Sequence, residues 1–505
     1  MHSILPLLGA TSLAGASVLQ QALINPTNQV LFGSYDSKPL VSSEALEAQI
    51  TEKNLRKRAE DLFSIAQEGV EEYNHPTRLT LCHTGHLATI NYIYATIAEL
   101  DDYYEISNQT FDAVVGNVFE YRLVLGDRQP DSVLAMSLTP PTPDKEAVFG
   151  PLVLVANDGC NESDFPATIK GAIALIKRGV CGFGDKSALA GKAGAIAAVV
   201  YNNENGSVSG TLGTPSKYHV ASFGISNEDA QPLIKKLEAG DVIPSSAYMD
   251  AIVQKTGTTN IMAQTKGGDQ ENCVMLGGHS DSVAEGPGIN DDGTGSLTLL
   301  EVATHLADYK VNNCVRFAWW AGEEEGLLGS DYYVSQLSKE ENLKIRLFMD
   351  YDMMASPNYA YQVYNATDAA NPVGSEELRN LYTNYYEAHG QNWTYIPFDG
   401  RSDYDAFIKN GIPGGGIATG AEGVKSENEV AMFGGKAGEW YDHCYHQLCD
   451  DLDNLAYDAW VMNTKLVAHS VATYAVSFKG FPKRTDVKMN DVSEPSIYHG
   501  PKLIM

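Results

Sequence analysis

The sequence is poor in basic residues and, beyond its first residues, has no long apolar run. Lys and Arg number 35 against 64 Asp and Glu, so the formal net charge is −29. A surface this negative repels nucleic-acid phosphates and anionic lipid, so we exclude both as partners. After residue 22, no stretch reaches the roughly 18 to 20 consecutive apolar residues that a membrane-spanning helix needs. We therefore expect neither a nucleic-acid-binding protein nor a membrane protein.

Cysteine is also scarce, with seven residues in the whole chain. Because the number is odd, at least one thiol stays free if the others pair. We predict two disulfides, one closing a very short loop and one spanning a predicted hairpin. Two further cysteines that each precede an apolar strand form a third candidate pair. The short loop is closed by Cys444–Cys449, the predicted hairpin is spanned by Cys160–Cys181, and the third candidate pair is Cys273–Cys314.

The N-terminus has the composition of a secretory signal. Residues 4–13 are apolar and are followed by small residues, which predicts cleavage between residues 16 and 20. Its first residues contain His2 but no Lys or Arg, so a buried first helix is the alternative. We expect a signal peptide at 1–20, a spacer or propeptide at 21–38, and a secreted protein, with the vacuole as the alternative location. Five Asn-X-Ser/Thr sequons agree with this route: Asn108, Asn161, Asn205, Asn365 and Asn392.

A chain of 505 residues is long enough for two or three domains. Helical spacing of apolar residues predicts a first helix over residues 42–72, capped by Ser43. The segment 128–251 differs from the rest, because short apolar strands near 152–155, 172–176 and 195–201 are separated by Gly, Asn and Asp. This pattern predicts a small β-rich domain inserted into a larger one.

From residue 252 onward, apolar strands alternate with helical stretches. The strands lie near 274–276, 315–320 and 347–349, and one intervening helix lies near 296–307. This alternation predicts an α/β fold with a mixed, mostly parallel sheet and helices on both faces. We place the two parts of this main domain at residues 39–127 and 252–483, with the insert between them and a tail at 484–505.

Polar residues follow three of these strands where each strand ends. The carboxyl ends of parallel strands share one edge of a sheet, and ligands bind there. The residues expected at this edge include His279 and Asp281 after the first strand, the run Glu323 to Glu325 after the second, and Asp350 and Asp352 after the third. Asp291 and Asp292 lie between the first two strands, and Tyr445 and His446 come late in the chain.

Each of these residues alone has an ordinary structural explanation, such as a core histidine, a turn or a helix cap. Together they match the chemistry of zinc, which binds His nitrogen and carboxylate oxygen in catalytic sites. Two His and three carboxylates suffice for two zinc ions if one carboxylate bridges them, as in sites whose metals lie about 3.5–4 Å apart. Three carboxylates and one hydroxide also balance the charge of two zinc ions. The adjacent Glu323 and Glu324 provide one ligand and one general base.

These motifs resemble those of the co-catalytic di-zinc aminopeptidases, and most closely the secreted and vacuolar fungal members. The resemblance covers nearly all of the chain beyond the signal, in order, spacing and flanking residues. It implies the zinc exopeptidase fold and two zinc ions per chain. On this resemblance, His279 and Asp352 hold one zinc, Glu324 and His446 hold the other, and Asp291 bridges them.

The same resemblance assigns further roles around the predicted metal site. Glu323 falls on the general base, Tyr445 on a tyrosine that stabilises the tetrahedral intermediate, and Arg401 on an arginine near the scissile carbonyl. It also implies the Cys444–Cys449 disulfide around the zinc histidine. A cis peptide after the bridging aspartate, between Asp291 and Asp292, is a further feature of these enzymes.

Three assignments have competing candidates. Asp350 competes with Asp352 as a ligand, although Asp352 followed by Met353 fits the resembling enzymes better. Asp292 competes with Asp291, and the flanking glycines favour Asp291. Asp281 either orients His279 as a supporting carboxylate or lies in a solvated turn.

The inserted segment resembles a protease-associated domain over residues 171–179 and 184–201. It has no catalytic residues of its own, so it either limits access to the site, helps to select substrates or is a passive insertion. The expected activity of the chain is hydrolysis of the N-terminal peptide bond of peptides and proteins, with release of leucine and other apolar residues by a monomer. The alternatives are a carboxypeptidase or glutamate-releasing peptidase on the same fold, and a binding protein without metals.

Overall fold

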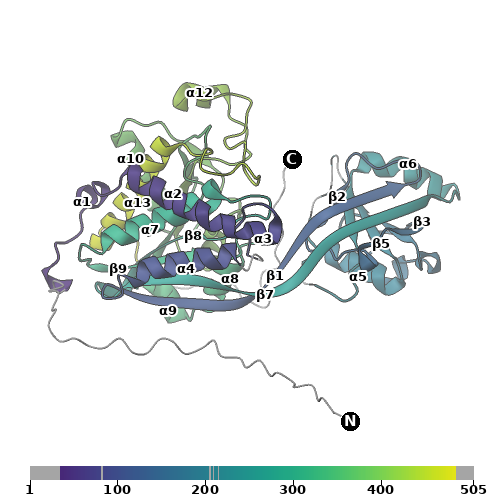
Figure 1. Cartoon of the computed structure of the whole chain (residues 1–505), viewed down its shortest axis with the longest axis horizontal. Helices are drawn as coiled ribbons and strands as arrows, with labels where there is room; N and C mark the ends of the chain where they lie inside the picture. The colour runs from purple at the N-terminus through teal and green to yellow at the C-terminus, as the bar shows by residue number, and fades with distance from the viewer. Residues whose placement is uncertain are drawn as a thin grey trace, which may run out of the picture.

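The computed structural model describes residues 35–80, 84–203, 206, 208, 210–213 and 215–484. Figure 1 shows an α/β body with a smaller lobe at one side, joined to the body by two long strands. The predicted signal peptide, most of the predicted spacer, Cys82, the Asn205 sequon and residues 485–505 lie outside the described residues. None of the helices in the described chain is both long enough and apolar enough to cross a membrane.

The body is built on one mixed sheet, as predicted. Its three predicted strands are present as β8 (Asp269–His279), β9 (Asn313–Trp320) and β10 (Ile345–Tyr351), and they pair in parallel at the centre of the sheet. The carboxyl ends of all three therefore lie at one edge. The sheet order is β12 (Thr394–Ile396), β11 (Gln362–Tyr364), β13 (Gly414–Ala418), β10, β8, β9, β7 (Pro244–Thr265) and β1 (Tyr104–Leu125).

Helices cover both faces of this sheet, because alternate side chains of each buried strand point to opposite faces. Val274 and Leu276 of β8 belong to one apolar cluster and Met275 to another. The first cluster packs against α1 (Ser43–Glu47), α2 (Glu52–Ala66), α4 (Gly85–Ala98), α7 (Gly295–Leu306), α10 (Ser375–Ala388) and α13 (Tyr457–Val476). The second packs against α8 (Leu328–Ser335) and α11 (Tyr404–Lys409). The remaining α-helices of the described body are α3 (Val70–Tyr73), α9 (Lys339–Lys344) and α12 (Glu427–Phe433).

The prediction of one helix over residues 42–72 with Ser43 as its cap is wrong. The segment forms α1, α2 and α3, and the cap of α1 is Ser42, whose side chain accepts a hydrogen bond from the Ala45 backbone N–H. Thr51 starts α2 in the same way by accepting from the Asn54 N–H. The apolar spacing continues across the break because both helices bury residues in the same cluster. Periodicity alone therefore could not locate the break.

The lobe grows from β1 and β7, which pair antiparallel from Tyr104 opposite Thr265 to Leu125 opposite Ser245. In the lobe, β7 also pairs with β3 (Val148–Leu154), and the sheet continues through β4 (Ile173–Lys177), β5 (Ala197–Tyr201), β6 (Ser222–Ile225) and β2 (Leu134–Ala135). The three predicted strands are thus present. Two helices that we did not predict, α5 (Phe183–Ala193) and α6 (Asn227–Glu238), pack on this sheet. The predicted boundaries at 128 and 251 stay predictions, and β7 runs without interruption across the second.

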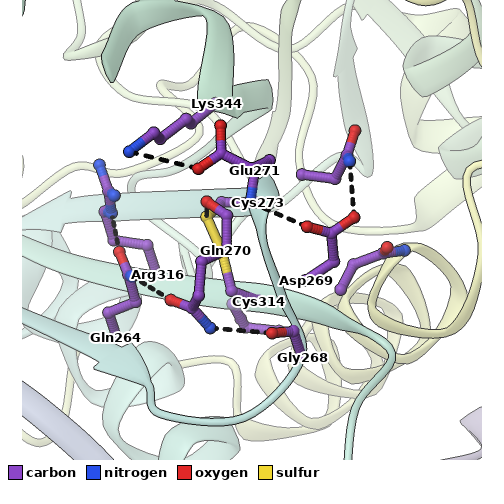
Figure 2. The surroundings of a disulfide bond; sticks show 12 residues. Gln264, Gly268, Asp269, Gln270, Glu271, Cys273, Cys314, Arg316 and Lys344 are labelled. Carbon is purple, nitrogen blue, oxygen red and sulfur yellow. Dashed lines mark hydrogen bonds and ion pairs between the residues drawn. A yellow bond between two sulfur atoms is a disulfide. The ribbon is translucent and has the colours of Figure 1, made fainter. Parts of the chain in front are cut away.

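All three candidate disulfides are present in the structure: Cys160–Cys181, Cys273–Cys314 and Cys444–Cys449. Cys273 and Cys314 join the neighbouring strands β8 and β9, whose other ends reach the polar edge. Figure 2 shows this disulfide beside a chain of hydrogen bonds from Arg316 through Gln264 to Gln270.

Gly295, the first residue of α7, packs tightly against residues at the polar edge of the sheet. A Cβ on Gly295 would overlap the carbonyl oxygen of Tyr351 at the end of β10 and the carboxylate of Asp292. We expect Gly295→Ala to lower the free energy of unfolding by about 1–3 kcal/mol, as over-packing of a core does. Chemical denaturation of the purified variant measures this change.

Gly257→Ala is the matched control. Gly257 lies in β7, and a Cβ there has open space around it. An unfolding free energy for Gly295→Ala equal to that of this control would show that the close approach at Gly295 is not real.

Candidate functional site

Five segments of the chain bring the predicted metal ligands, Glu323 and Tyr445 to one edge of the body. His279 ends β8, Glu323 and Glu324 follow β9, and Asp352 follows β10. Asp291 lies in the irregular turn Ile289–Thr294 between β8 and α7. The fifth loop carries Tyr445 and His446 and is closed by the Cys444–Cys449 disulfide. The structure thus brings together all five predicted ligands.

Asp291 lies between two histidines. Its Oδ1 is 3.3 Å from His279 Nε2, and its Oδ2 is 3.1 Å from His446 Nε2. Glu324 Oε2 is 3.0 Å from His446 Nε2, and Asp352 Oδ1 is 3.9 Å from His279 Nε2. Two donor atoms on one tetrahedral zinc, each at 2.0–2.2 Å from the ion, are roughly 3.3–3.6 Å apart. The side chains therefore form two groups with the spacing of metal ligands, and Asp291 is shared by both.

Several of these donor atoms have no hydrogen-bond partner. Among the described residues, His279 Nε2, Glu324 Oε1 and Asp352 Oδ1 are buried and unpaired by hydrogen bonds. Buried polar atoms in folded proteins almost always have such a partner, so each exception needs an explanation. His279 has ligand atoms of Asp291 and Glu324 within 4.8 Å in one group and those of Glu323 and Asp352 within 4.8 Å in another, which fits bound cations, and the residue types fit zinc.

The electrostatics of the site also favour cations. Burial raises the pKa of Glu324 to about 7 and that of Asp352 to about 6, and the nearby Asp291 carboxylate contributes to both shifts. The pKa of Glu323 is raised by burial and by the carboxylates of Glu324, Asp403 and Asp352. Like charges held this close disfavour ionisation. Bound metal ions would supply positive charge beside these carboxylates and so would favour their ionised form.

The competing aspartates occupy different surroundings. Asp292 faces main-chain amides, because its Oδ2 accepts from the His279 N–H at 3.1 Å and its Oδ1 from the Gly295 N–H at 2.8 Å. Asp350 belongs to β10 itself and is fully buried. The peptide bond between Asp291 and Asp292 is cis, as the resemblance implies.

Asp281 holds the loop that follows β9. Its Oδ1 accepts from the backbone N–H groups of Gly322 at 2.9 Å and Glu323 at 3.2 Å, and its Oδ2 from that of Glu324 at 3.4 Å. It also lies 3.6 Å from His279 Nδ1. The sequence did not reveal this hold on Glu323 and Glu324, because it depends on which loops meet across the sheet edge.

Tyr445 and Arg401 lie beside the metal-ligand group. The Tyr445 ring stacks on His446 with ring centres 3.8 Å apart, and its hydroxyl is 3.4 Å from Arg401 Nη2. Arg401 is held by an ion pair with Glu422 at 2.9 Å. Both predicted residues therefore face the same cavity as the carboxylates.

A cavity of 370 Å³ opens over this edge. Its lining includes Asp291, Glu323, Glu324 and Asp352, and a further wall is formed by residues of β11 and β12 and of the segments that follow β10 and β13. The sequence did not locate this wall, because its residues come from separate segments: Met353, Tyr364, Ile396, Val424 and Tyr441.

Comparison with known proteins agrees with this architecture. The model of peptidase family M28 matches residues 260–471, and that of the PA domain matches residues 148–233. Aminopeptidase Y of Saccharomyces cerevisiae is 49% identical over 91% of this chain and 85% of its own length. The probable leucine aminopeptidase 2 of Aspergillus oryzae is 42% identical over 90% of each chain.

Solved structures share the fold. The aminopeptidase from Aneurinibacillus sp. strain AM-1 superposes with a TM-score of 0.67 at 25% identity, over 86% of this chain and 96% of that one. A zinc aminopeptidase from Bacillus subtilis has the same fold, with a TM-score of 0.57 at 23% identity, over 85% and 97% of the two chains. The expected family and inserted domain are confirmed: the chain belongs to peptidase family M28 and contains a PA domain.

Proposed function

We propose that this protein is a zinc-dependent aminopeptidase that binds two zinc ions per chain. His279 and Asp352 would hold one ion, Glu324 and His446 the other, and Asp291 would bridge them. The observation that carries the proposal is the position of Asp291, whose two oxygens each lie within 3.3 Å of a different histidine nitrogen. Zinc bound there would polarise the scissile carbonyl and lower the pKa of the attacking water.

Glu323 is the residue best placed to move protons. Its Oε2 is 3.7 Å from His279 Nε2, so it lies beside the ligand group, and it lines the cavity. The raised pKa of Glu323 makes its carboxylate a stronger base, which suits a group that must accept and then release a proton. In the proposed reaction, Glu323 takes a proton from the attacking water and passes it to the leaving amine.

Tyr445 and Arg401 are placed to stabilise developing charge. The Tyr445 hydroxyl and the Arg401 guanidinium lie 3.4 Å apart at the cavity wall, so both can donate toward one substrate oxygen. Fixed donors aimed at a developing oxyanion are among the largest contributions to catalysis. We assign Tyr445 to the oxyanion and Arg401 to the substrate beside its scissile carbonyl.

The substrate would be the N-terminus of a peptide or protein. The relatives named above are aminopeptidases, and the acidic groups of the cavity complement a charged terminal amine. Apolar lining residues such as Met353, Ile396 and Val424 support release of leucine and other apolar residues. We place the protein in the secretory route, since its three disulfides need an oxidising compartment and the sequons at Asn108, Asn161, Asn365 and Asn392 are exposed.

Replacing the proposed base should separate metal binding from turnover. We expect Glu323→Gln to keep two zinc ions per chain and to lower kcat by about 100- to 10,000-fold, because the amide cannot accept the proton. Zinc content and the hydrolysis rate of leucine p-nitroanilide measure the two effects. Glu340→Gln, on the exposed first turn of α9, is the control. A Glu323→Gln enzyme with normal kcat would remove this residue from the proton-transfer role.

Metal analysis tests the shared ligand. We expect two zinc ions per chain, loss of activity on chelation and recovery when zinc is restored. Asp352→Ala should weaken one zinc site, whereas Asp291→Ala should weaken both because its two oxygens face different histidines. A single zinc ion in the wild-type protein, or loss of one ion only in Asp291→Ala, would contradict the bridging role.

Substrate termini separate an aminopeptidase from the alternative peptidases. We expect leucine p-nitroanilide to be cleaved and N-acetyl-leucine p-nitroanilide to be cleaved at least about tenfold less well, because acetylation removes the charged amine that the acidic cavity would bind. An N-acetylated peptide with a free carboxylate serves as the comparison. Efficient removal of its C-terminal residue would point to a carboxypeptidase instead.

A further inference from the structure

Asp450 is a buried carboxylate that the proposed reaction does not use. It ends the loop that carries Tyr445 and His446, and it is 2% exposed. Its two oxygens accept hydrogen bonds from consecutive backbone N–H groups: Oδ1 from Asn290 at 2.9 Å and Oδ2 from Asp291 at 3.0 Å. The backbone of Asp291 is therefore held by the same loop whose His446 faces the Asp291 side chain.

Asp450 is itself fixed by a buried network. The Asn454 side-chain amide donates to Asp450 Oδ1 at 3.0 Å and to both oxygens of Asp442, at 2.9 and 3.0 Å. Asp442 in turn accepts from the Asn290 side chain at 2.6 Å and from the Cys444 N–H at 2.8 Å. Both ends of the His446 loop are thus tied to the turn that contains Asp291.

The network also reaches the loop that follows Asp352. Asn290 Oδ1 accepts from the Ala355 N–H at 3.0 Å, and its amide donates to Ser356 Oγ at 3.1 Å. Asn290 is fully buried. Three of the loops that carry proposed ligands therefore meet at one side chain, although none of these network residues faces the cavity.

We propose that Asp450 is a positioning residue that holds Asp291 between the two histidines, with Asp442 and Asn454 holding Asp450, before any metal binds. The inference rests on the proposed zinc site and adds to it the group that fixes the shared ligand. Two adjacent N–H groups bound by one carboxylate leave the Asp291 backbone little freedom to turn. Because Asp291 faces both histidines, a shift of its backbone would misplace it for both at once.

Asp450→Asn tests this role with little change in shape. The substitution places an amide N–H against a backbone N–H, so one of the two bonds to Asn290 and Asp291 is lost and a donor is left unpaired. We expect zinc affinity, measured by competition with a fluorescent chelator, to fall about 10- to 100-fold, as it does when groups supporting a metal ligand are removed. Asp453→Asn removes the same charge from an exposed position three residues away, and its zinc affinity should equal that of wild type.

The thermal unfolding of the metal-free variants separates positioning from stability. A residue that only stabilises the fold would lower the unfolding temperature in Asp450→Asn and leave the zinc affinity of the folded fraction unchanged, which would overturn the proposal. If the wild-type chain itself binds no zinc, the proposed function fails instead. Normal zinc binding by both wild type and Asp450→Asn would overturn the positioning role and leave the proposed function standing.

Hydrogen exchange of the wild-type protein gives a second test that needs no variant. We expect the peptide containing Asn290 and Asp291 to be strongly protected in both the zinc-loaded and the metal-stripped full-length chain, since its amides are bonded to Asp450. Rapid exchange of this peptide after zinc removal would overturn the proposal, because the metal and not Asp450 would then hold the loop.

Discussion

The structure depends on a dense group of buried carboxylates at the carboxyl edge of the sheet. A buried charge is costly unless it is paired or hydrogen-bonded. Two classes stand out among these carboxylates: one has oxygens turned toward the two histidines, and the second accepts hydrogen bonds from main-chain N–H groups. Asp281, Asp292 and Asp450 form the second class, and between them they hold the loops after β8, after β9 and before α7.

The second role, in which a carboxylate binds the backbone of another loop, follows from the parallel strands at the centre of the sheet. Because β8, β9 and β10 end side by side, the loops that follow them offer unpaired N–H groups within reach of one another. An aspartate on one loop can then accept from the next, as Asp281 does from Gly322 and Glu323. Short aspartate side chains join the loops that carry the proposed ligands. Because these loops start at the ends of neighbouring strands, the spacing of the strands sets the spacing of the ligands.

The sequence predicted the parts of the molecule that are local or repetitive. The apolar strands that lead to His279, Glu323 and Asp352 were identified by their pattern, and the type and order of the polar residues that follow indicated a metal site. The supporting roles of Asp292 and Asp450 were not predicted, since they depend on contacts between residues 13 and 159 positions apart. The break between α1 and α2 was missed because both helices bury apolar residues in one cluster. The aspartates next to the predicted ligands in the sequence were the signal that could have pointed to the supporting roles of Asp292 and Asp450.

The ribbon of β1 and β7 ties the lobe to the body in a particular way. β7 pairs with β9 in the body and with β3 in the lobe, so one continuous strand belongs to both sheets. Between these two segments β7 pairs with β1, so a two-stranded ribbon, and not an irregular linker, connects the lobe to the body. Since β9 leads into the loop of Glu323 and Glu324, the strand that enters the lobe is hydrogen-bonded to the strand that precedes the proposed proton-transfer residue.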